Sequence, residues 1–135
     1  MKMELRKATH KDYMTVWYAV RPKKIEYCTA NMITNDYLRD RLFVVREGGK
    51  VIATVSLVPE TEYGYTAIKR LCILNKRNCG RGVASFAVRE LQKVVRGKCG
   101  ATPWSDNIAM RKLLESEGFT LQYIFDGRWC FYAKD

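Results

Sequence analysis

The chain has 135 residues, of which 47% are hydrophobic and 12% aromatic, and its formal net charge is +10. This length is typical of one domain with its own core, and the apolar content excludes a disordered chain. We therefore predict a single domain over residues 1–135. The N-terminal segment lacks a signal-peptide core and no apolar run could span a bilayer, so we expect a cytoplasmic protein with no membrane partner.

Charge and residue usage narrow the function classes further. Lys and Arg total 24 against 14 Asp and Glu, and such a surface attracts polyanions. The chain lacks the aromatic–basic signatures of RNA-binding modules and a recognition helix, so nucleic acid is not the expected partner. His10 is the only histidine, which predicts no metal site and no histidine-activated nucleophile. The cysteines form no CxxC pair and are expected to be small buried residues: Cys28, Cys72, Cys79, Cys99 and Cys130.

The N-terminal part predicts one strand and one or two helices. The segment "MELRKAT", residues 3–9, alternates as a strand does. Thr9 followed by Asp12 resembles a capping box, and a helix through Trp17 should follow. Residues 21–41 have a mixed pattern that we interpret as partly helical. Its candidates for burial are Ile25, Met32, Tyr37 and Leu38.

The middle of the chain has the period of strands. The segment "LFVVREGGKVIATVSLVP", residues 42–59, predicts a hairpin that turns at its paired glycines and ends at Pro59. Its second strand should direct one set of side chains to one face: Val51, Ala53, Val55 and Leu57. After a turn in "ETEYGY", a strand over 65–74 should alternate without interruption, so that Ile68, Arg70, Cys72 and Leu74 share a face.

Helical spacing returns after Gly82. The expected buried positions of this helix are Ala84, Ala87, Val88, Leu91, Val94 and Val95, and Gly97 should end it. A short strand over 101–104 and a helix capped by Asp106 come next, the helix burying Met110, Leu113 and Leu114. A hairpin at Asp126-Gly127 closes the chain. The order predicts a mixed α/β domain, with one sheet and helices over its faces.

The boundary between the 65–74 strand and the following helix is both basic and glycine-rich. Lys76, Arg77 and Arg81 surround Gly80 and Gly82. A helix N-terminus presents unpaired N–H groups and partial positive charge, and glycines let a ligand approach the main chain. The pattern suits a pyrophosphate, although a tight, solvated turn would have the same composition.

Two segments carry a resemblance to a known family. The residues 77–84, "RNCGRGVA", resemble the Arg/Gln-x-x-Gly-x-Gly/Ala signature of the GCN5-related N-acetyltransferases, the GNAT family. The residues 107–119, "NIAMRKLLESEGF", are similar to that family's late helix. The resemblance implies a central, mostly antiparallel mixed sheet that is flanked by helices and splays after the central strand.

The same resemblance implies acetyl-CoA as co-substrate and assigns its contacts. The amides from Cys79 to Val83 would hold the pyrophosphate with the Arg77 side chain beside it, and Asn107 would orient the pantetheine arm. The arm would pair with the backbone of residues 72–74. The complete expected set is Cys72, Ile73, Leu74, Arg77, Asn78, Cys79, Gly80, Arg81, Gly82, Val83, Ala84 and Asn107.

The catalytic groups are left unassigned by the sequence. The family's usual proton donor is a Tyr seven positions after the leading Asn, where this chain has Leu114. Tyr123 or water could replace it, and Glu60 and Glu62 are candidate bases. The resemblance implies an amine acceptor, either a small molecule or a peptide N-terminus, and a possible homodimer. The alternative is a GNAT-fold module that binds acetyl-CoA with little or no turnover.

Overall fold

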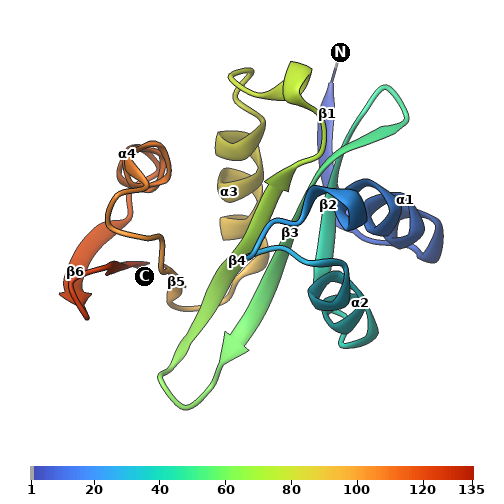
Figure 1. The fold of residues 1–135 in the computed structure, drawn as a ribbon. Coiled ribbons are helices and arrows are strands. Elements are labelled where there is room, and N and C mark those ends of the chain that lie inside the picture. Colours follow the sequence, from blue (N-terminus) through green and yellow to red (C-terminus); the bar gives the residue numbers. More distant parts are fainter. Residues whose placement is uncertain (1) are drawn as a thin grey trace.

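The computed structural model describes residues 2–135 and builds them into one sheet with helices on both faces (Figure 1). In chain order the elements are β1 (Met3–Lys7), α1 (His10–Val20), η1 (Arg21–Lys23), α2 (Ala30–Leu38), β2 (Leu42–Glu47), β3 (Lys50–Glu60), β4 (Tyr65–Ile73), η2 (Lys76–Asn78), α3 (Val83–Val94), β5 (Cys99–Ala101), α4 (Ile108–Ser116), β6 (Thr120–Phe125) and β7 (Trp129–Lys134).

Within residues 2–135 the sheet has seven strands, in the order β1-β2-β3-β4-β5-β7-β6. Among these described strands only β4 and β5 are parallel; the other neighbours are antiparallel. The two parallel strands pair at just two positions, Thr66 with Cys99 and Ala67 with Gly100. Figure 1 shows the part from β5 onward turned away from β4. The predicted α/β fold class, including the splayed central sheet, is confirmed.

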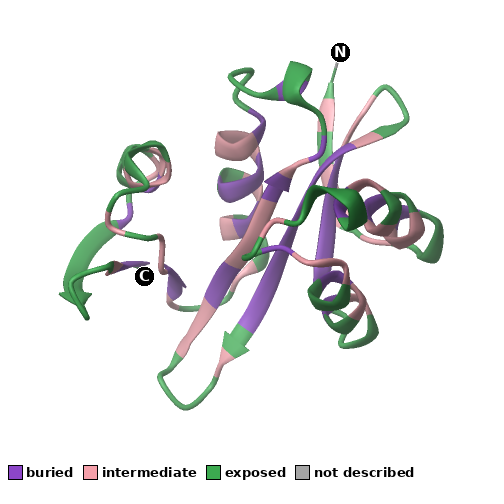
Figure 2. Ribbon diagram, viewed as in Figure 1, coloured by how far each residue is buried: buried purple, intermediate pink, exposed green. Residues whose placement is uncertain are grey.

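Two apolar clusters hold the helices against opposite faces of the sheet. On one face Ala87 and Leu91 of α3 pack with Leu114 of α4. On the other face Val16 of α1 and Ile33 of α2 are fully buried in a second cluster. Figure 2 shows the buried strands between helices whose outer sides are exposed. Such one-sided burial is what amphipathic helices supply to a sheet.

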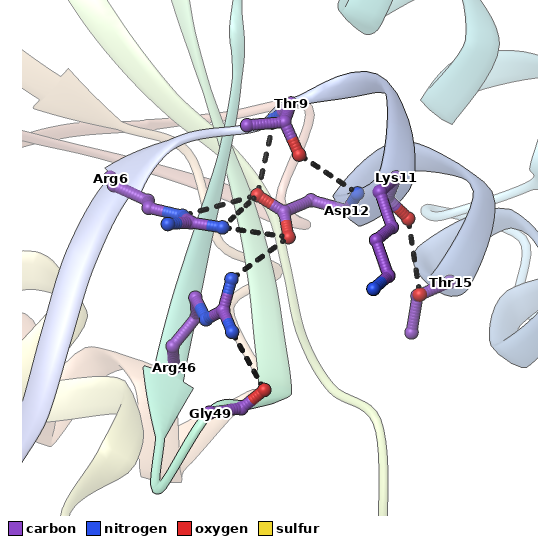
Figure 3. Close-up of polar contacts among 7 residues, drawn as sticks. All are labelled: Arg6, Thr9, Lys11, Asp12, Thr15, Arg46 and Gly49. Atoms are coloured by element: carbon purple, nitrogen blue, oxygen red, sulfur yellow. Dashed lines mark hydrogen bonds and ion pairs between the residues drawn. The ribbon is translucent and has the colours of Figure 1, made fainter.

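The first helix begins at the predicted capping box, which also anchors a buried charge. The Thr9 hydroxyl accepts a hydrogen bond from the Asp12 N–H (3.2 Å), and the Asp12 carboxylate accepts one from the Thr9 N–H (3.1 Å). Asp12 is only 3% exposed and binds Arg6 and Arg46 (Figure 3). Arg46 also donates to the Gly49 carbonyl at 2.7 Å. The carboxylate therefore ties together β1, α1 and the β2–β3 turn.

Burial raises the pKa of Asp12, but the hydrogen bonds from Thr9 and Arg6 outweigh it and lower this pKa overall. The charged carboxylate is therefore the form that the fold favours.

The sequence prediction is wrong about which residues of α2 are buried and about which residue caps α4. In α2 the buried apolar residue is Ile33, whereas Met32 is partly exposed and Leu38 is 75% exposed. The cap at Thr29 sets this phase, since its hydroxyl accepts from the Met32 N–H. In the fourth helix the cap is Asn107, not Asp106, and its side chain accepts from the Met110 N–H at 3.2 Å.

The predicted side chains of β3 do not all lie on one face of the sheet, because the strand contains a bulge. The partner of Val45 is Ala53 and that of Arg46 is Val51, so Ile52 is an extra residue. Val51 consequently packs against the α1/α2 cluster, while Ala53 and the other predicted members lie in the α3/α4 cluster. One inserted residue reverses the side-chain alternation.

Strand and helix ends differ from the prediction by one or two residues. Pro59 pairs with Thr66 inside β3, which ends at Glu60. The backbone of Val95 is already extended, so α3 ends at Val94 and leaves that side chain 51% exposed. The next strand therefore begins earlier than expected, at Cys99.

Four of the five cysteines are buried, as predicted, and Cys79 is exposed. Within residues 2–135 no helix has the length and apolar content needed to cross a membrane.

Candidate functional site

The edge of β4 that faces β5 loses its partner after Ala67, within residues 2–135. The Leu74 N–H donates to Ile52 of β3 at 2.9 Å, and Cys72 pairs with Thr54. Because N–H groups alternate between the two edges of a strand, those of Leu71 and Ile73 point away from β3. Of the three residues predicted to pair with a pantetheine arm, Ile73 is therefore the one that offers its N–H at the open edge.

A second bulge interrupts β4 itself and overturns its predicted alternation. Cys72 pairs with Thr54 and Lys69 pairs with Ser56, so Arg70 and Leu71 both lie opposite the single residue between them. Arg70 has a φ of 54°, in the left-handed region that residues other than glycine rarely adopt. As a result, Ile68 faces α3 while Cys72 faces α1 and α2.

The glycine loop at the end of β4 has the geometry of an anion site. Gly80 and Gly82 have φ values of 77° and 79°, and a Cβ on either would point into open space. Gly82 is the N-cap of α3, and no side chain caps this helix. The hydrogen bonds of residues 2–135 use none of the N–H groups from Gly80 to Ala84. These groups are free to bind a ligand.

One predicted main-chain donor, the N–H of Cys79, is already engaged in this loop. The N–H groups of Asn78 and Cys79 donate to the carbonyls of Asn75 (2.9 Å) and Lys76 (3.0 Å), closing the η2 turn. We therefore remove Cys79 from the expected amide donors and add Ala84, so that the set becomes residues 80–84. The correction arises because a 3₁₀ turn consumes donors that the sequence motif counts as free.

The loop's three cations are not equivalent. Lys76 and Arg77 are exposed. Arg81 instead donates to Asn78 at 2.6 Å and forms a bidentate pair with Glu47, at 2.8 and 2.9 Å. Hydrogen bonding between the pair lowers the pKa of Glu47 and raises that of Arg81. The mobile charge predicted at Arg81 is thus neutralised by a residue that the sequence did not single out.

A hollow of about 380 Å³ lies between this loop and the β2–β3 turn. Its lining residues are Glu47, Gly48, Lys50, Ile52, Arg77, Asn78 and Arg81. The predicted residues Arg77, Asn78 and Arg81 therefore meet around one depression, which is next to the free N–H groups of the loop.

The α4 residues of the motif have structural contacts. Asn107 uses its side-chain oxygen to cap α4, which leaves its amide N–H₂ for another partner. Leu114 is 0% exposed and belongs to the core. Leu114 therefore cannot donate a proton, because its side chain has no acidic hydrogen and is fully buried.

The candidate acid and base residues lie near the start of β4. Glu60 forms an ion pair with Lys69 at 3.0 Å, and Glu62 is exposed in the turn. Tyr123 is 57% exposed and packs on Phe131 with 5.2 Å between ring centroids. The ring centroid of the half-buried Tyr65 lies 5.1 Å from that of Phe131.

Burial, followed by the nearby charges of Glu60 and Tyr123, raises the pKa of Tyr65. Tyr65 thus remains protonated at neutral pH and joins the candidates, although no motif marked it.

Sequence reasoning missed Asp36 and Ser56, which are 1% and 0% exposed. Asp36 binds the bulge residue Arg70, and the Ser56 hydroxyl donates a hydrogen bond to Asp36. Asp36 is 34 residues before Arg70 in the chain. An acidic residue in an amphipathic helix is normally solvated, and nothing in the local pattern distinguishes this one.

Comparison with known families decides the assignment. The model of the acetyltransferase (GNAT) family matches residues 6–119. The chain belongs to the GNAT acetyltransferase family. Members of this family use acetyl-CoA.

Solved structures show the same fold at low sequence identity. A GNAT acetyltransferase from Streptococcus agalactiae superposes with a TM-score of 0.79 at 20% identity, covering 98% of this chain and 94% of that one. The aminoglycoside acetyltransferase AAC(6')-Ib in complex with coenzyme A superposes with a TM-score of 0.76 at 18% identity. The match covers 98% of this chain and 94% of that one.

Arabidopsis thaliana Naa50, in complex with the bisubstrate analogue CoA-Ac-MVNAL, superposes with a TM-score of 0.74 at 11% identity. The match covers 100% of this chain and 99% of that one. No curated protein matches this chain.

Proposed function

We propose that this GNAT protein is an acetyl-CoA-dependent N-acetyltransferase that acetylates a primary amine on a small molecule or a peptide N-terminus. The observation that carries the proposal is the presence of free main-chain donors at two places along one segment. One is the unpaired edge of β4 and the other is the uncapped N-terminus of α3. The open space above Gly80 and Gly82 fits a ligand that contacts the main chain.

The residues have separate tasks in this proposal. The N–H groups of residues 80–84, with Arg77 and Lys76, would hold the diphosphate at the positive end of α3. The Ile73 main chain would pair with the pantetheine arm, and the free amide N–H₂ of Asn107 would orient it. When bound, acetyl-CoA supplies an acetyl thioester that a neutral amine can attack. The N–H of Leu71 at the bulge would then stabilise negative charge on the acyl oxygen.

The expected class of acceptor amine follows from the shortage of side chains that could remove a proton from the amine or donate one to the thiolate. Glu60 is paired with Lys69, and Leu114 cannot transfer a proton. Deprotonating a lysine-like amine with a pKa of ~10.4 at pH 7 costs about 4.6 kcal/mol, whereas an α-amine near ~7.8 costs about 1 kcal/mol. We therefore expect peptide α-amines and other weakly basic amines to react faster than lysine-like amines.

Gly82→Ala tests the placement of the diphosphate. Its Cβ would enter the space above the free N–H groups, so acetyl-CoA affinity in calorimetry should fall by about tenfold or more. Gly97→Ala is the matched control, because Gly97 has a φ of 88° and open surroundings but lies beyond the other end of α3. Equal affinity in the two variants would contradict the placement.

The second candidate function is a binding module without turnover, and the burial of Leu114 favours it. Release of free CoA thiol over a panel of amines separates the two functions. Binding of acetyl-CoA in calorimetry with no thiol release for any amine would support the module and overturn the enzyme.

A further inference from the structure

The bulge in β4 is held by a buried network that reaches it from α2. Arg70 donates through Nε to Oδ2 of Asp36 at 2.5 Å and through Nη2 to Oδ1 at 2.8 Å. The Ser56 hydroxyl donates to the same Oδ2 at 2.6 Å. Asp36 is 1% exposed and the Arg70 side chain 19%. This is a forked arginine–carboxylate pair, the most directional ion pair available to a protein.

The network and the unusual backbone of Arg70 depend on each other. A left-handed conformation at a residue with a side chain costs about 1–2 kcal/mol, so it persists only where other contacts impose it. A buried carboxylate without its cation costs more than that. Asp36 therefore fixes where the guanidinium lies, and the guanidinium in turn holds the φ of 54° at Arg70.

The next residue along the chain is Leu71, whose N–H points to the open edge of β4. A relaxed Arg70 would change the backbone angles at the bulge, and this would rotate the adjoining N–H of Leu71. Donors that stabilise charge in a transition state must be placed within about half an ångström. The free N–H groups of residues 80–84 lie beyond the end of β4 and do not depend on the bulge.

We propose that Asp36 is a positioning residue for acetyl transfer: by holding Arg70 in its left-handed conformation, it aims the Leu71 N–H at the acyl oxygen. The inference rests on the proposed transferase function. Asp36 touches no substrate, and it acts on the rate of the chemical step rather than on the binding of acetyl-CoA.

Asp36→Asn tests this role, because it keeps the shape of the side chain and removes its charge. We expect kcat to fall about 10- to 100-fold, as for a misplaced catalytic group. The calorimetric Kd for acetyl-CoA should stay within about twofold. Arg70→Lys should have the same effects on kcat and Kd, since a lysine cannot donate two parallel hydrogen bonds to the Asp36 carboxylate. The two substitutions combined should cost about as much kcat as either alone.

The matched control is Asp12→Asn, another buried carboxylate with two arginine partners. Within residues 2–135 its hydrogen bonds and ion pairs go to Arg6, Thr9 and Arg46 and not to β4. Its kcat should equal that of the wild type. Ser56→Ala removes only one hydrogen bond and provides a milder variant in case Asp36→Asn does not fold. We expect a kcat about 3- to 10-fold lower.

Each negative outcome has one meaning. A wild type that releases no thiol with any amine overturns the proposed function and this inference with it. An active wild type whose kcat is unchanged in Asp36→Asn or Ser56→Ala overturns the inference alone. A parallel loss of kcat and acetyl-CoA affinity would assign Asp36 a purely structural role and also overturn it.

Discussion

Asp12 and Asp36 are both buried carboxylates that bind arginine, yet they serve different parts of the molecule. Asp12 begins α1 and joins it to β1 and to the β2–β3 turn (Figure 3). Asp36 lies on α2 and binds Ser56 of β3 and Arg70 of β4. The first network reaches the candidate site only through the β2–β3 turn, which lines the hollow beside the glycine loop. The second network ends on β4, at the bulge next to the open edge of that strand.

The partners of the two acids also differ in their access to water. The Arg6 and Arg46 side chains are 39% and 22% exposed, and their contacts with Asp12 are 3.1 and 3.5 Å long. Arg70 is 19% exposed and binds Asp36 more closely. Removing one partner of an ion pair costs more stability when the pair is sealed from water, because the remaining charge then stays buried and unpaired. The comparison teaches that similar burial of an acid can serve anchoring in one place and positioning in another.

The largest expected effect is on stability. Asp36→Ala leaves Arg70 and Ser56 without their acceptor and should lower the free energy of unfolding by about 3–5 kcal/mol. Asp12→Ala should cost about 1–3 kcal/mol, since its arginines can turn to solvent. Urea denaturation followed by circular dichroism measures both. A larger loss for Asp12→Ala would reverse the comparison.

The pH dependence of stability should reveal the Asp12 network. Its pKa is lowered in the folded state, so the unfolded chain takes up the proton first as the pH falls. The stabilisation is therefore fully present above the unfolded pKa, near 3.9, and is lost as the pH falls through the folded pKa. Denaturation midpoints of wild type and Asp12→Asn should converge on acidification. A constant difference from pH 6 to pH 2 would contradict the assignment.

The two helix caps allow a smaller, matched test. Thr9 caps α1 and Thr29 caps α2, each accepting from a main-chain N–H at 3.2 Å. Thr9→Ala and Thr29→Ala should each cost about 1 kcal/mol of stability. Only Thr29→Ala loosens the helix that carries Asp36, so only this variant should also lower kcat. Equal kcat values in the two variants would argue against transmission through α2.

An exposed arginine–carboxylate pair gives the smallest expected effect. Glu47→Gln frees Arg81 for the diphosphate, and acetyl-CoA should bind about two- to fivefold more tightly at low salt. Glu117→Gln is the matched control, because it breaks the Arg89 pair and changes the net charge by the same amount. Equal tightening in both variants would show a general charge effect rather than a local one.

The sequence was sufficient for features that are decided within a few residues. The capping box at Thr9, the hairpin at Gly48 and the helix after Gly82 were predicted and are present. Gly80 and Gly82 were expected to leave the main chain of the loop accessible, and both have a positive φ, which glycine adopts without strain. Local chemistry therefore predicted most of the order of the elements and a glycine loop before α3, and the resemblance of two motifs predicted the family. Anion binding at the loop stays a prediction.

The face of α2 was misplaced because its local cap at Thr29 was missed. The errors in the strands have a distant cause, since the bulges at Ile52 and Arg70 reversed the alternation of β3 and β4. A bulge inserts one residue at a point that the neighbouring strand selects, so a single strand's pattern does not contain it.

The amino-acid sequence by itself determined a GNAT domain with a glycine loop at the start of α3. Only the tertiary structure decided that Asp36 meets Arg70 across 34 residues, that Glu47 neutralises Arg81 and that the N–H of Cys79 is already used. The physical reason is range. Caps, turns and glycine conformations depend on neighbours in the chain, whereas a buried ion pair forms only where packing brings two distant side chains together and removes the water between them.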